Sequence, residues 1–481
     1  MNILRRLWQW FDDRTGTSEA IKPLLAHRVP PKLGWWYVFG TATLTAFAIQ
    51  VVTGIFLASV YVASPEGAFV SLKYITQTAP FGHLLRGIHY FGASAMVLFA
   101  AVHMTRVFLT AAYKYPREMS WISGTFLLVL TLGMGFTGQL LRWDQNAIWS
   151  VVVGAEQAGR LPFIGNWVGH FILGGQTMGA DTLGHMFSIH VFILPILIVA
   201  VVGLHLYLVI RNGISELPRS GNPVVPETYR ETYHNMLEAT GEPFWPRAAW
   251  RDVAFGTLVL VGIVFLAYVV GPPALGKPPN PTLIQAEPRP DWYFLWYFAI
   301  LALSPHGLES YIMILGPLLT GVILIGLPLV FRKGERAMRH RPWAPIFVLT
   351  IFTALIALTL AGIKAPWSPR FDAKPLTTSI VGASSGPVWE GAQIFNKKGC
   401  LYCHQIEGHG GFRGPDLTYV AAHMTRQQLI IQVMNGGYNM PAFGGILSSD
   451  DLHSLIEFLE TRTPKGEKPV EYTPGASLKD K

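Results

Sequence analysis

Charged side chains are scarce in this chain of 481 residues. Asp, Glu, Lys and Arg together make up 14% of it, hydrophobic residues make up 51%, and the mean hydropathy is +0.34. This scarcity excludes a wholly water-soluble protein and indicates a membrane protein with a soluble part. The opening stretch, MNILRRLWQWFDDRTG, lacks the uninterrupted apolar core of a cleavable signal. We expect it to form an amphipathic helix at the membrane surface.

Seven apolar stretches are long enough to cross a membrane as helices. They predict an all-α fold, a seven-span helix bundle. The approximate spans are 35–62, 84–112, 121–141, 183–210, 253–270, 311–331 and 344–363.

Lys and Arg in the connecting segments predict the orientation of the bundle. The segments on the N-terminal side of the seven spans hold 18 of them, and the opposite connections hold 5. Because basic residues are retained on the cytoplasmic side, the N-terminus is predicted inside a bacterial inner membrane and the C-terminal part outside, in the periplasm. The net charge of +8 reflects mostly this bias, so we do not interpret it as a nucleic-acid surface.

Composition divides the chain into six parts. A cytoplasmic amphipathic segment (1–34) comes first, four spans occupy 35–240, and three spans occupy 241–364, after the Pro- and Trp-containing passage TGEPFWPRAAW. Residues 365–387 have the Pro, Ser, Thr and Gly content of a linker. A small polar domain is expected at 388–463, and a disordered tail at 464–481.

Four histidines in two apolar stretches carry the strongest signal. His89 and His103 are 14 residues apart, and His190 and His205 are 15 apart. On an α-helix, 14 residues end about 40° short of four full turns, and 15 residues end about 60° beyond four. Each helix therefore presents its two imidazoles on nearly one face. Paired side by side, the helices would form two bis-imidazole sites for two b-type haems, His89 with His190 and His103 with His205. The alternative is hydrogen-bonded structural histidines or a proton path.

Arginines and glycines stand at matching positions. Arg86 and Arg106 each lie a turn beyond one of the first two histidines, and they suit haem propionates. Arg211 could do the same, or it could be an arginine at a helix end whose side chain extends to the membrane surface. Two glycine pairs also stand 14 residues apart, where a missing Cβ would let a macrocycle approach the backbone. They are Gly40 with Gly54 and Gly124 with Gly138.

The only two cysteines, Cys400 and Cys403, stand in CLYCH with His404. Two thiols at this spacing can bond a haem covalently while the adjacent imidazole ligates its iron, so the motif predicts a c-type haem. A disulfide or a chance pair of cysteines is the alternative. Met440 is the predicted sixth iron ligand, with Met424 and His423 as rivals.

These motifs resemble a known family. Over about residues 1–365 the chain is similar to cytochrome b of the bc-type, Rieske/cytochrome b complexes that oxidise quinol. The 15-residue interval and the passage near residue 245 resemble the chloroplast-type cytochrome b followed by its subunit IV, here joined. The remainder resembles a class I cytochrome c. The similar segments are RGIHYFGASAMVLFAAVHMTRVF, SGTFLLVLTLGMGFTG, RWDQ, SIHVFILP, GEPFWP, PDWYF, EGAQIFNKKGCLYCH, GPDL, MPAF and SSDDLHSLIEFLE.

The segment PDWYF resembles the family's PEWY quinol-site loop. The resemblance implies that Asp291 accepts a quinol proton while Tyr293, Pro290 and Trp292 shape the pocket; taken alone, Asp291 would be read as a solvated loop residue. Asp in place of Glu is similar to variants associated with menaquinol, which makes menaquinone the implied quinone.

Two positions depart from the family. Val38 stands where the chloroplast-type protein has a cysteine for an additional covalent haem, so no covalent extra haem is expected. Arg142 replaces the proline of a PW pair and suits either a haem propionate or a partner protein.

The resemblance implies the fused cytochrome b and c subunit of a membrane quinol:cytochrome c oxidoreductase. Quinol would be oxidised outside, one electron would pass to a Rieske protein and the c haem, and the other would cross through the two b haems, coupled to proton translocation. Both cysteines are used in CLYCH, so the Rieske protein must be another chain. A homodimeric complex and an external c-type or other soluble electron acceptor are also implied. The alternatives are a quinone-reactive haem conduit without bifurcation and a membrane anchor for another redox enzyme.

Overall fold

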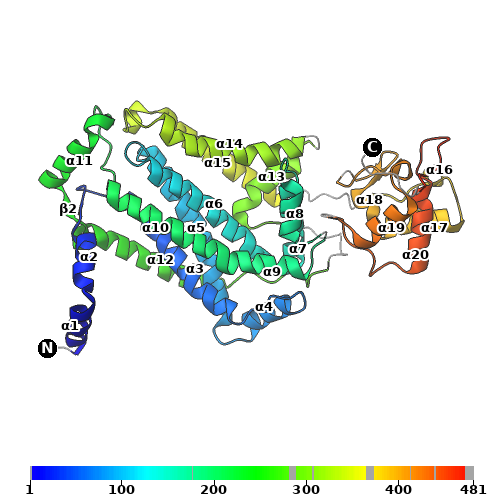
Figure 1. Ribbon diagram of the computed structural model, residues 1–481, viewed down its shortest axis with the longest axis horizontal. Helices are drawn as coiled ribbons and strands as arrows, with labels where there is room; N and C mark the ends of the chain where they lie inside the picture. Colours follow the sequence, from blue (N-terminus) through cyan, green and yellow to red (C-terminus); the bar gives the residue numbers. More distant parts are fainter. Residues whose placement is uncertain are drawn as a thin grey trace.

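The chain is helical almost throughout. The computed structural model describes residues 3–175, 177–280, 289–305, 308–364, 373–411, 413–437 and 440–471. Figure 1 shows a bundle of long helices with a small separate domain at one end. The strands in the described part are two short antiparallel pairs, so the predicted all-α class is confirmed. These pairs are β1 (Arg28–Val29) with β2 (Glu242–Pro243), and β3 (Gln405–Ile406) with β4 (His409–Gly410).

Among the described residues, seven helical stretches are long and apolar enough to cross a membrane, as the sequence predicts. The fourth joins α9 (Ala180–Ser188), η2 (Ile189–Ile193) and α10 (Leu194–Asn212), and the fifth joins η3 (Phe244–Ala248) to α12 (Ala249–Val269). The others are α3 (Phe39–Ala58), α5 (Gly82–Leu109), α6 (Glu118–Leu140), α14 (Glu309–Val330) and α15 (Trp343–Lys364).

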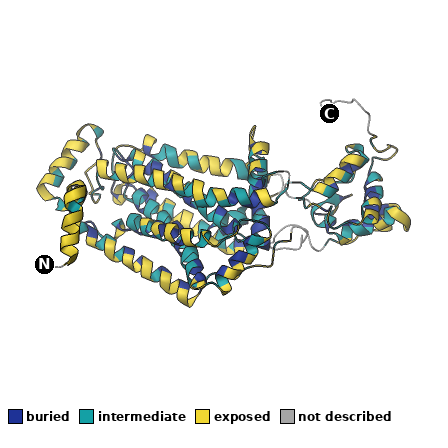
Figure 2. Ribbon diagram, turned by 60° about the horizontal axis from the view of Figure 1, so that its bottom comes forward, coloured by how far each residue is buried: buried dark blue, intermediate teal, exposed yellow. Residues whose placement is uncertain are grey.

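Packing among these helices makes a core of four. Helix α3 packs on α5 and α6 packs on α10, while α12 covers α3 and α5 and α15 lies against α5. Small residues such as Ala42 and Ala46 are fully buried at the helix contacts, whereas large apolar ones such as Val322 and Leu349 point outward. Figure 2 shows exposed residues along the outer faces of the long helices. An apolar exterior of this kind fits lipid, so the chain is an integral membrane protein.

Shorter helices connect the spans at the two ends of the bundle. At the end near the small domain, called here the c-domain end, lie α4 (Gly67–Gln77), α7 (Gln145–Gly159), α8 (Gly165–Leu173), η4 (Trp292–Phe294) and α13 (Leu295–Leu303). At the opposite end lie α1 (Ile3–Thr15), α2 (Thr17–Ala26), η1 (Trp35–Tyr37), α11 (Pro226–Thr240) and η6 (Met338–His340).

Helix α1 exposes one set of apolar side chains. Leu4, Leu7, Trp8 and Phe11 are all largely exposed, and they recur at helical spacing beside Arg5 and other polar residues. A helix with this pattern can lie in a membrane surface, and that position for α1 stays a prediction.

Buried cations close the helix ends opposite the c-domain end. Lys114 donates to the carbonyls of Phe331 and Lys333, and Arg117 donates to the carbonyl of Gly213, just past α10. Burial, with the nearby charges of Arg341 and Arg336, lowers the pKa of Lys114 to about 8. These donors satisfy the carbonyls that the last turns leave unpaired and fix the helix ends relative to one another.

The small domain is built around an apolar core that includes Phe395, Leu401 and Phe458. A Cβ on Gly391 would overlap the Ser454 carbonyl, so only glycine permits the close crossing of its first and last long helices. The helices are α16 (Thr378–Val381), α17 (Gly386–Lys397), α18 (Cys400–Cys403), η7 (Val420–Ala422), α19 (Arg426–Asn435) and α20 (Ser449–Glu460).

Part of the predicted linker belongs to this domain. Leu376 and Val381 are buried in its core, so the packed unit begins before residue 388. Residues 365–372 of the linker and 472–481 of the tail lie outside the described residues.

Candidate functional site

The fourth span contains an insertion that explains its 15-residue histidine interval. Residues Ile189–Ile193, which include His190, form a π-turn between α9 and α10. A π-turn accommodates one extra residue. The side chains of His190 and His205 therefore have nearly the same relative direction around the helix axis as His89 and His103, which are 14 residues apart on α5. Pro195, which has no N–H to donate to the carbonyl four residues earlier, stands at the start of the following helix. The sequence predicts a regular helix here, and this deviation improves the alignment of the two imidazoles.

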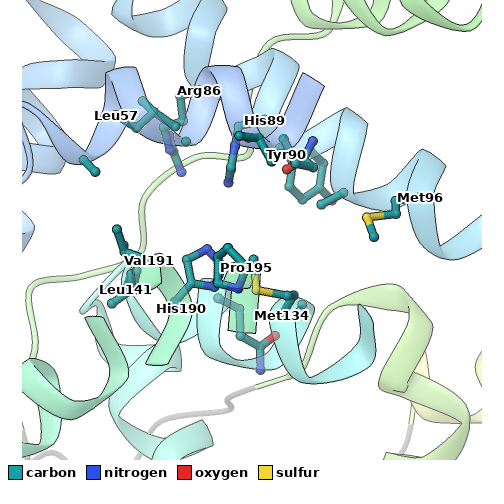
Figure 3. A pocket seen from close by; sticks show the side chains of 18 of the residues that line it. Leu57, Arg86, His89, Tyr90, Met96, Met134, Leu141, His190, Val191 and Pro195 are labelled. Carbon is teal, nitrogen blue, oxygen red and sulfur yellow. The ribbon is translucent and has the colours of Figure 1, made fainter. Parts of the chain in front are cut away.

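His89 and His190 face each other across a cavity of about 280 Å³ (Figure 3). Their ring centroids are 6.4 Å apart. Two imidazoles bound to opposite sides of one metal, each by a bond of about 2 Å, would bring their centroids about 6 Å apart once the ring radii are included. The separation therefore fits axial ligation of one haem iron.

Hydroxyl groups on the flanking helices hold three of the four imidazoles. Each hydroxyl forms a hydrogen bond with the Nδ1 atom of one histidine, which leaves the Nε2 atom of that histidine for a metal. The pairs are Thr53 with His89 at 2.9 Å, Thr137 with His190 at 3.0 Å, and Ser123 with His205 at 2.9 Å. Sequence reasoning missed these residues, although a Ser-Gly or Thr-Gly dipeptide recurs at all three positions.

The four predicted glycines each face one of the four histidines. A Cβ on Gly138 would lie 2.7 Å from Cε1 of His190, and one on Gly40 would lie 3.1 Å from Cε1 of His103. For Gly54 with His89 and Gly124 with His205 the distances would be 3.3 and 3.4 Å. At each of these glycines the nearest group is an imidazole ring, so the missing Cβ makes room for that ring as well as for a macrocycle.

The second histidine pair lies nearer the opposite end of the bundle. His103 and His205 lie near each other, and Arg106 lies one turn further along α5. Arg106 is buried against the Tyr37 ring, and its Nε and Nη2 atoms have no hydrogen-bond partner among the described residues. A buried guanidinium with two such nitrogens beside an imidazole pair fits a haem propionate. Arg211 is exposed and donates to the Tyr207 hydroxyl, which favours the helix-end alternative.

Two arginines line the cavity at His89 and His190. Arg86 is buried and donates to the Thr76 hydroxyl, and Arg142 lies 3.8 Å from the carboxylate of Asp144. Asp144 also caps α7 by accepting from the Ala147 N–H. Two cations at one edge of the cavity suit a pair of carboxylates such as haem propionates, and Asp144 holds Arg142 in place.

The PDWY segment reaches the same cavity. Asp291 and Tyr293 both line it, and the Tyr293 hydroxyl donates to Oδ2 of Asp291 at 3.1 Å. Burial, with the charge of Asp291, raises the pKa of Tyr293, which keeps its hydroxyl a donor. Pro290 precedes Asp291 in the loop, and the Trp292 indole N–H donates to the hydroxyl of Ser94, which lines the cavity.

Residues of α6 position this segment. Gln139 accepts from the Asp291 N–H at 3.1 Å, and its own Nε2 is buried with no partner in the described part of the chain. A Cβ on Gly135 would lie 2.7 Å from the Tyr293 hydroxyl. These residues lie about 150 positions from Asp291 in the sequence, where no local pattern marks them.

In the small domain, Cys400 and Cys403 are free thiols on α18. Burial raises the pKa of Cys400 to about 12 and that of Cys403 to about 11. His404 follows directly, with Nδ1 bonded to the Pro415 carbonyl at 2.9 Å, so Nε2 is left for iron. A Cβ on Gly414 would lie 2.6 Å from this ring.

Among the three candidate sixth ligands, Met440 packs at the edge of the same core, where Gln432 approaches its sulfur at 3.7 Å. Met424 also packs on this core, and His423 lies beside it at the end of η7. Met440 as the iron ligand stays a prediction.

The donor sets fit haem better than a bare ion. No three His, Cys, Asp or Glu side chains of the described residues gather so as to hold a metal by themselves. Paired axial imidazoles suit an iron whose other four ligands come from a porphyrin.

Comparisons with known proteins agree with this geometry. Family models match three segments: "Cytochrome b/b6/petB" at residues 24–213, "Cytochrome b(C-terminal)/b6/petD" at 278–381, and "Cytochrome C oxidase, cbb3-type, subunit III" at 387–459.

Relatives and a solved structure extend this match. The "Cytochrome bc complex cytochrome b subunit" of Chlorobaculum thiosulfatiphilum is 34% identical over 355 residues, which are 72% of this chain and 77% of that protein. The "Menaquinol:cytochrome c reductase cytochrome b subunit" of Geobacillus thermodenitrificans is 35% identical over 221 residues, 44% of this chain and 99% of that protein. The structure "Hyperthermophilic respiratory Complex III" matches with a TM-score of 0.63 and 26% identity, over 82% of this chain and 96% of that one. The chain therefore belongs to the cytochrome b/b6 family, as the cytochrome b of a bc-type quinol:cytochrome c oxidoreductase complex with a cytochrome c domain on the same polypeptide.

Proposed function

We propose that this chain oxidises quinol at the c-domain end of its bundle, together with a separate Rieske iron–sulfur protein. When bound, two b haems would supply a pair of one-electron carriers within the membrane, and one covalent c haem would supply a third outside it. The c-domain end faces the periplasm of a bacterial inner membrane and the N-terminus faces the cytoplasm, as the Lys and Arg distribution predicts. The reaction is proposed to be coupled to proton translocation, and each charge moved across the membrane against its potential stores about 2.3 kcal/mol per 100 mV.

The observation that carries this proposal is the shared cavity. His89, His190, Asp291 and Tyr293 all line it. A quinol there would lie beside both a carboxylate and the predicted outer haem site. Asp291 accepts a quinol proton and passes it to water at the loop, while Tyr293 keeps the carboxylate oriented by its hydrogen bond and Gln139 fixes the backbone.

Haem binding falls to residues of the four-helix core. His89 with His190 and His103 with His205 would hold the irons of the two b haems, and Cys400, Cys403, His404 and Met440 would hold the c haem. Arg106 is proposed for a propionate of the inner haem and Arg86 for one of the outer haem. Arg142, which lies 3.8 Å from Asp144, is placed to help at the outer haem.

We propose menaquinol as the quinol. Asp291 in place of Glu supports it, as does the name of the Geobacillus relative, a menaquinol:cytochrome c reductase subunit. The Rieske protein is a separate chain because both cysteines are used by the CLYCH motif. An external electron acceptor, such as a soluble cytochrome, and a homodimeric complex complete the proposal.

Asp291→Asn tests the quinol site. Loss of a positioned general base costs typically 10²- to 10⁴-fold, so we expect quinol-dependent cytochrome reduction in the purified complex to fall at least about 100-fold. The haem spectrum should stay unchanged, and Glu227→Gln on the exposed face of α11 is the matched control. Native activity in Asp291→Asn would contradict the role of the carboxylate. Quinol-dependent haem reduction without a Rieske protein in the native complex would favour the conduit without bifurcation.

A further inference from the structure

An ion pair joins the c-type domain to the membrane bundle. Nη1 of Arg413, in the loop after β4, lies 3.0 Å from Oε1 of Glu309, the first residue of α14. Only 4% of the Glu309 side chain is exposed, compared with 33% for Arg413. A buried carboxylate is costly without a partner, so Arg413 compensates a charge that the bundle has placed at its c-domain end.

Further polar groups surround this contact on the bundle. Arg160, just past α7, donates to the hydroxyl of Ser310 at 2.8 Å and pairs with Glu156 at 2.5 Å. Glu156 lies on the side of the bundle that approaches Cys403. The bundle therefore presents two carboxylates, Glu156 and Glu309, to the side of the domain that bears the haem-attachment motif.

Arg413 sits in the loop that holds the proximal histidine. The next residue, Gly414, donates from its N–H to the Cys403 carbonyl at 2.9 Å, and the Pro415 carbonyl bonds Nδ1 of His404. Hydrogen bonds therefore connect the segment that touches the bundle to the residues that orient the His404 ring. Figure 1 shows the small domain beside the end of the bundle that carries α7, α8 and α13.

We propose that the c-type domain docks on the bundle through Arg413 and Glu309, with its haem-attachment side inward, and that it accepts electrons in this docked position. The second half rests on the proposed function, since it concerns electrons that come from quinol. Docking shortens the distance between the bundle and the c haem, and the rate of electron transfer falls steeply with distance. The bundle surface at Glu156, Arg160, Glu309 and Ser310 is thus the receiving surface for the chain's own cytochrome c domain.

Spin-label distances test the docking directly in the full chain. Nitroxides placed on Leu161→Cys in the bundle and Lys397→Cys in the domain, both exposed sites, report the separation by pulsed electron resonance. We expect one narrow distance distribution in the otherwise native chain. Arg413→Glu and the milder Glu309→Gln should each broaden it, and the exchange Arg413→Glu with Glu309→Arg should narrow it again.

The control is Lys465→Glu, the same change of charge at an exposed position of the domain. It should leave the distribution narrow. Haem counts of every variant show whether the bundle and the domain have folded. A broad distribution in the native chain, or narrow distributions in both Arg413→Glu and Glu309→Gln, would overturn the docking.

Rapid mixing with quinol tests the electron-accepting half. Arg413→Glu should slow reduction of the c haem at least fivefold while the first reduction of the b haems keeps its native rate. Native c-haem kinetics in a variant shown to be undocked would refute this half alone. Absence of any quinol-dependent reduction in the native complex would instead refute the proposed function, and the distance result would stand.

Discussion

Gly138 is the glycine whose replacement should disturb the haem sites most. It lies on α6 directly opposite His190, and a Cβ there would stand 2.7 Å from Cε1 of the imidazole. Ordinary contact begins at 3.4 Å, so the ring must retreat by about 0.7 Å or the helices must separate. The Thr137 hydrogen bond and the π-turn both restrict that movement.

Overpacking of this kind costs typically about 1–3 kcal/mol. We therefore expect Gly138→Ala to weaken retention of the outer b haem by about 5- to 150-fold, since each 1.4 kcal/mol is a factor of ten. Gly124→Ala, on the same helix, would place its Cβ 3.4 Å from His205 and should retain the inner haem almost fully. The two substitutions are chemically identical, so the difference between them isolates the contact distance.

Pyridine haemochrome counts and reduced-minus-oxidised spectra of the purified variants measure these effects. Gly262→Ala is the control for a helix glycine, because nothing lies within 4 Å of its Cβ position. Gly138→Ala with two b haems at native potentials would refute the reasoning. So would an equal loss in Gly124→Ala.

Three further substitutions test the ligand environment. Thr137→Val should raise the potential of the outer haem by about 40 mV, because losing about 1 kcal/mol of hydrogen bonding makes His190 a weaker donor to ferric iron; an unchanged potential in a redox titration would contradict this. Arg106→Gln should lower the potential of the inner haem, on the order of 50 mV, since it removes a buried positive charge that favours the ferrous form, and the same titration shows it. Met440→Ala should lower the c-haem potential while Met424→Ala leaves it near the native value, and the reverse result would reassign the sixth ligand.

Much of the fold and the haem framework is predictable from the sequence. Apolar length alone gives the seven spans, and the helical period places His89 and His103 on one face. The glycines are identifiable by their repeated 14-residue spacing. What the sequence could not provide is the partner of each glycine, because contact between α6 and α10 depends on how the helices pack.

Other features depend on irregular backbone or on distant residues. The π-turn at His190 is invisible to a constant helical period, although Pro195 marks the place where regular hydrogen bonding fails. Gln139 and Gly135 meet the PDWY loop only after folding, since the two segments lie about 150 residues apart. The Arg413 ion pair is similarly unpredictable, because a single Arg in a polar loop is ordinarily solvated.

Haem stoichiometry tests the central claim most directly. A redox titration of the purified complex, combined with pyridine haemochrome counting, reports how many haems of each type the chain holds, and spectra recorded after quinol is added report whether quinol reduces them. We predict two b haems with distinct potentials for each covalent c haem, all reducible by quinol when the Rieske protein is present. One b haem per c haem, or two that quinol does not reduce, would contradict the account.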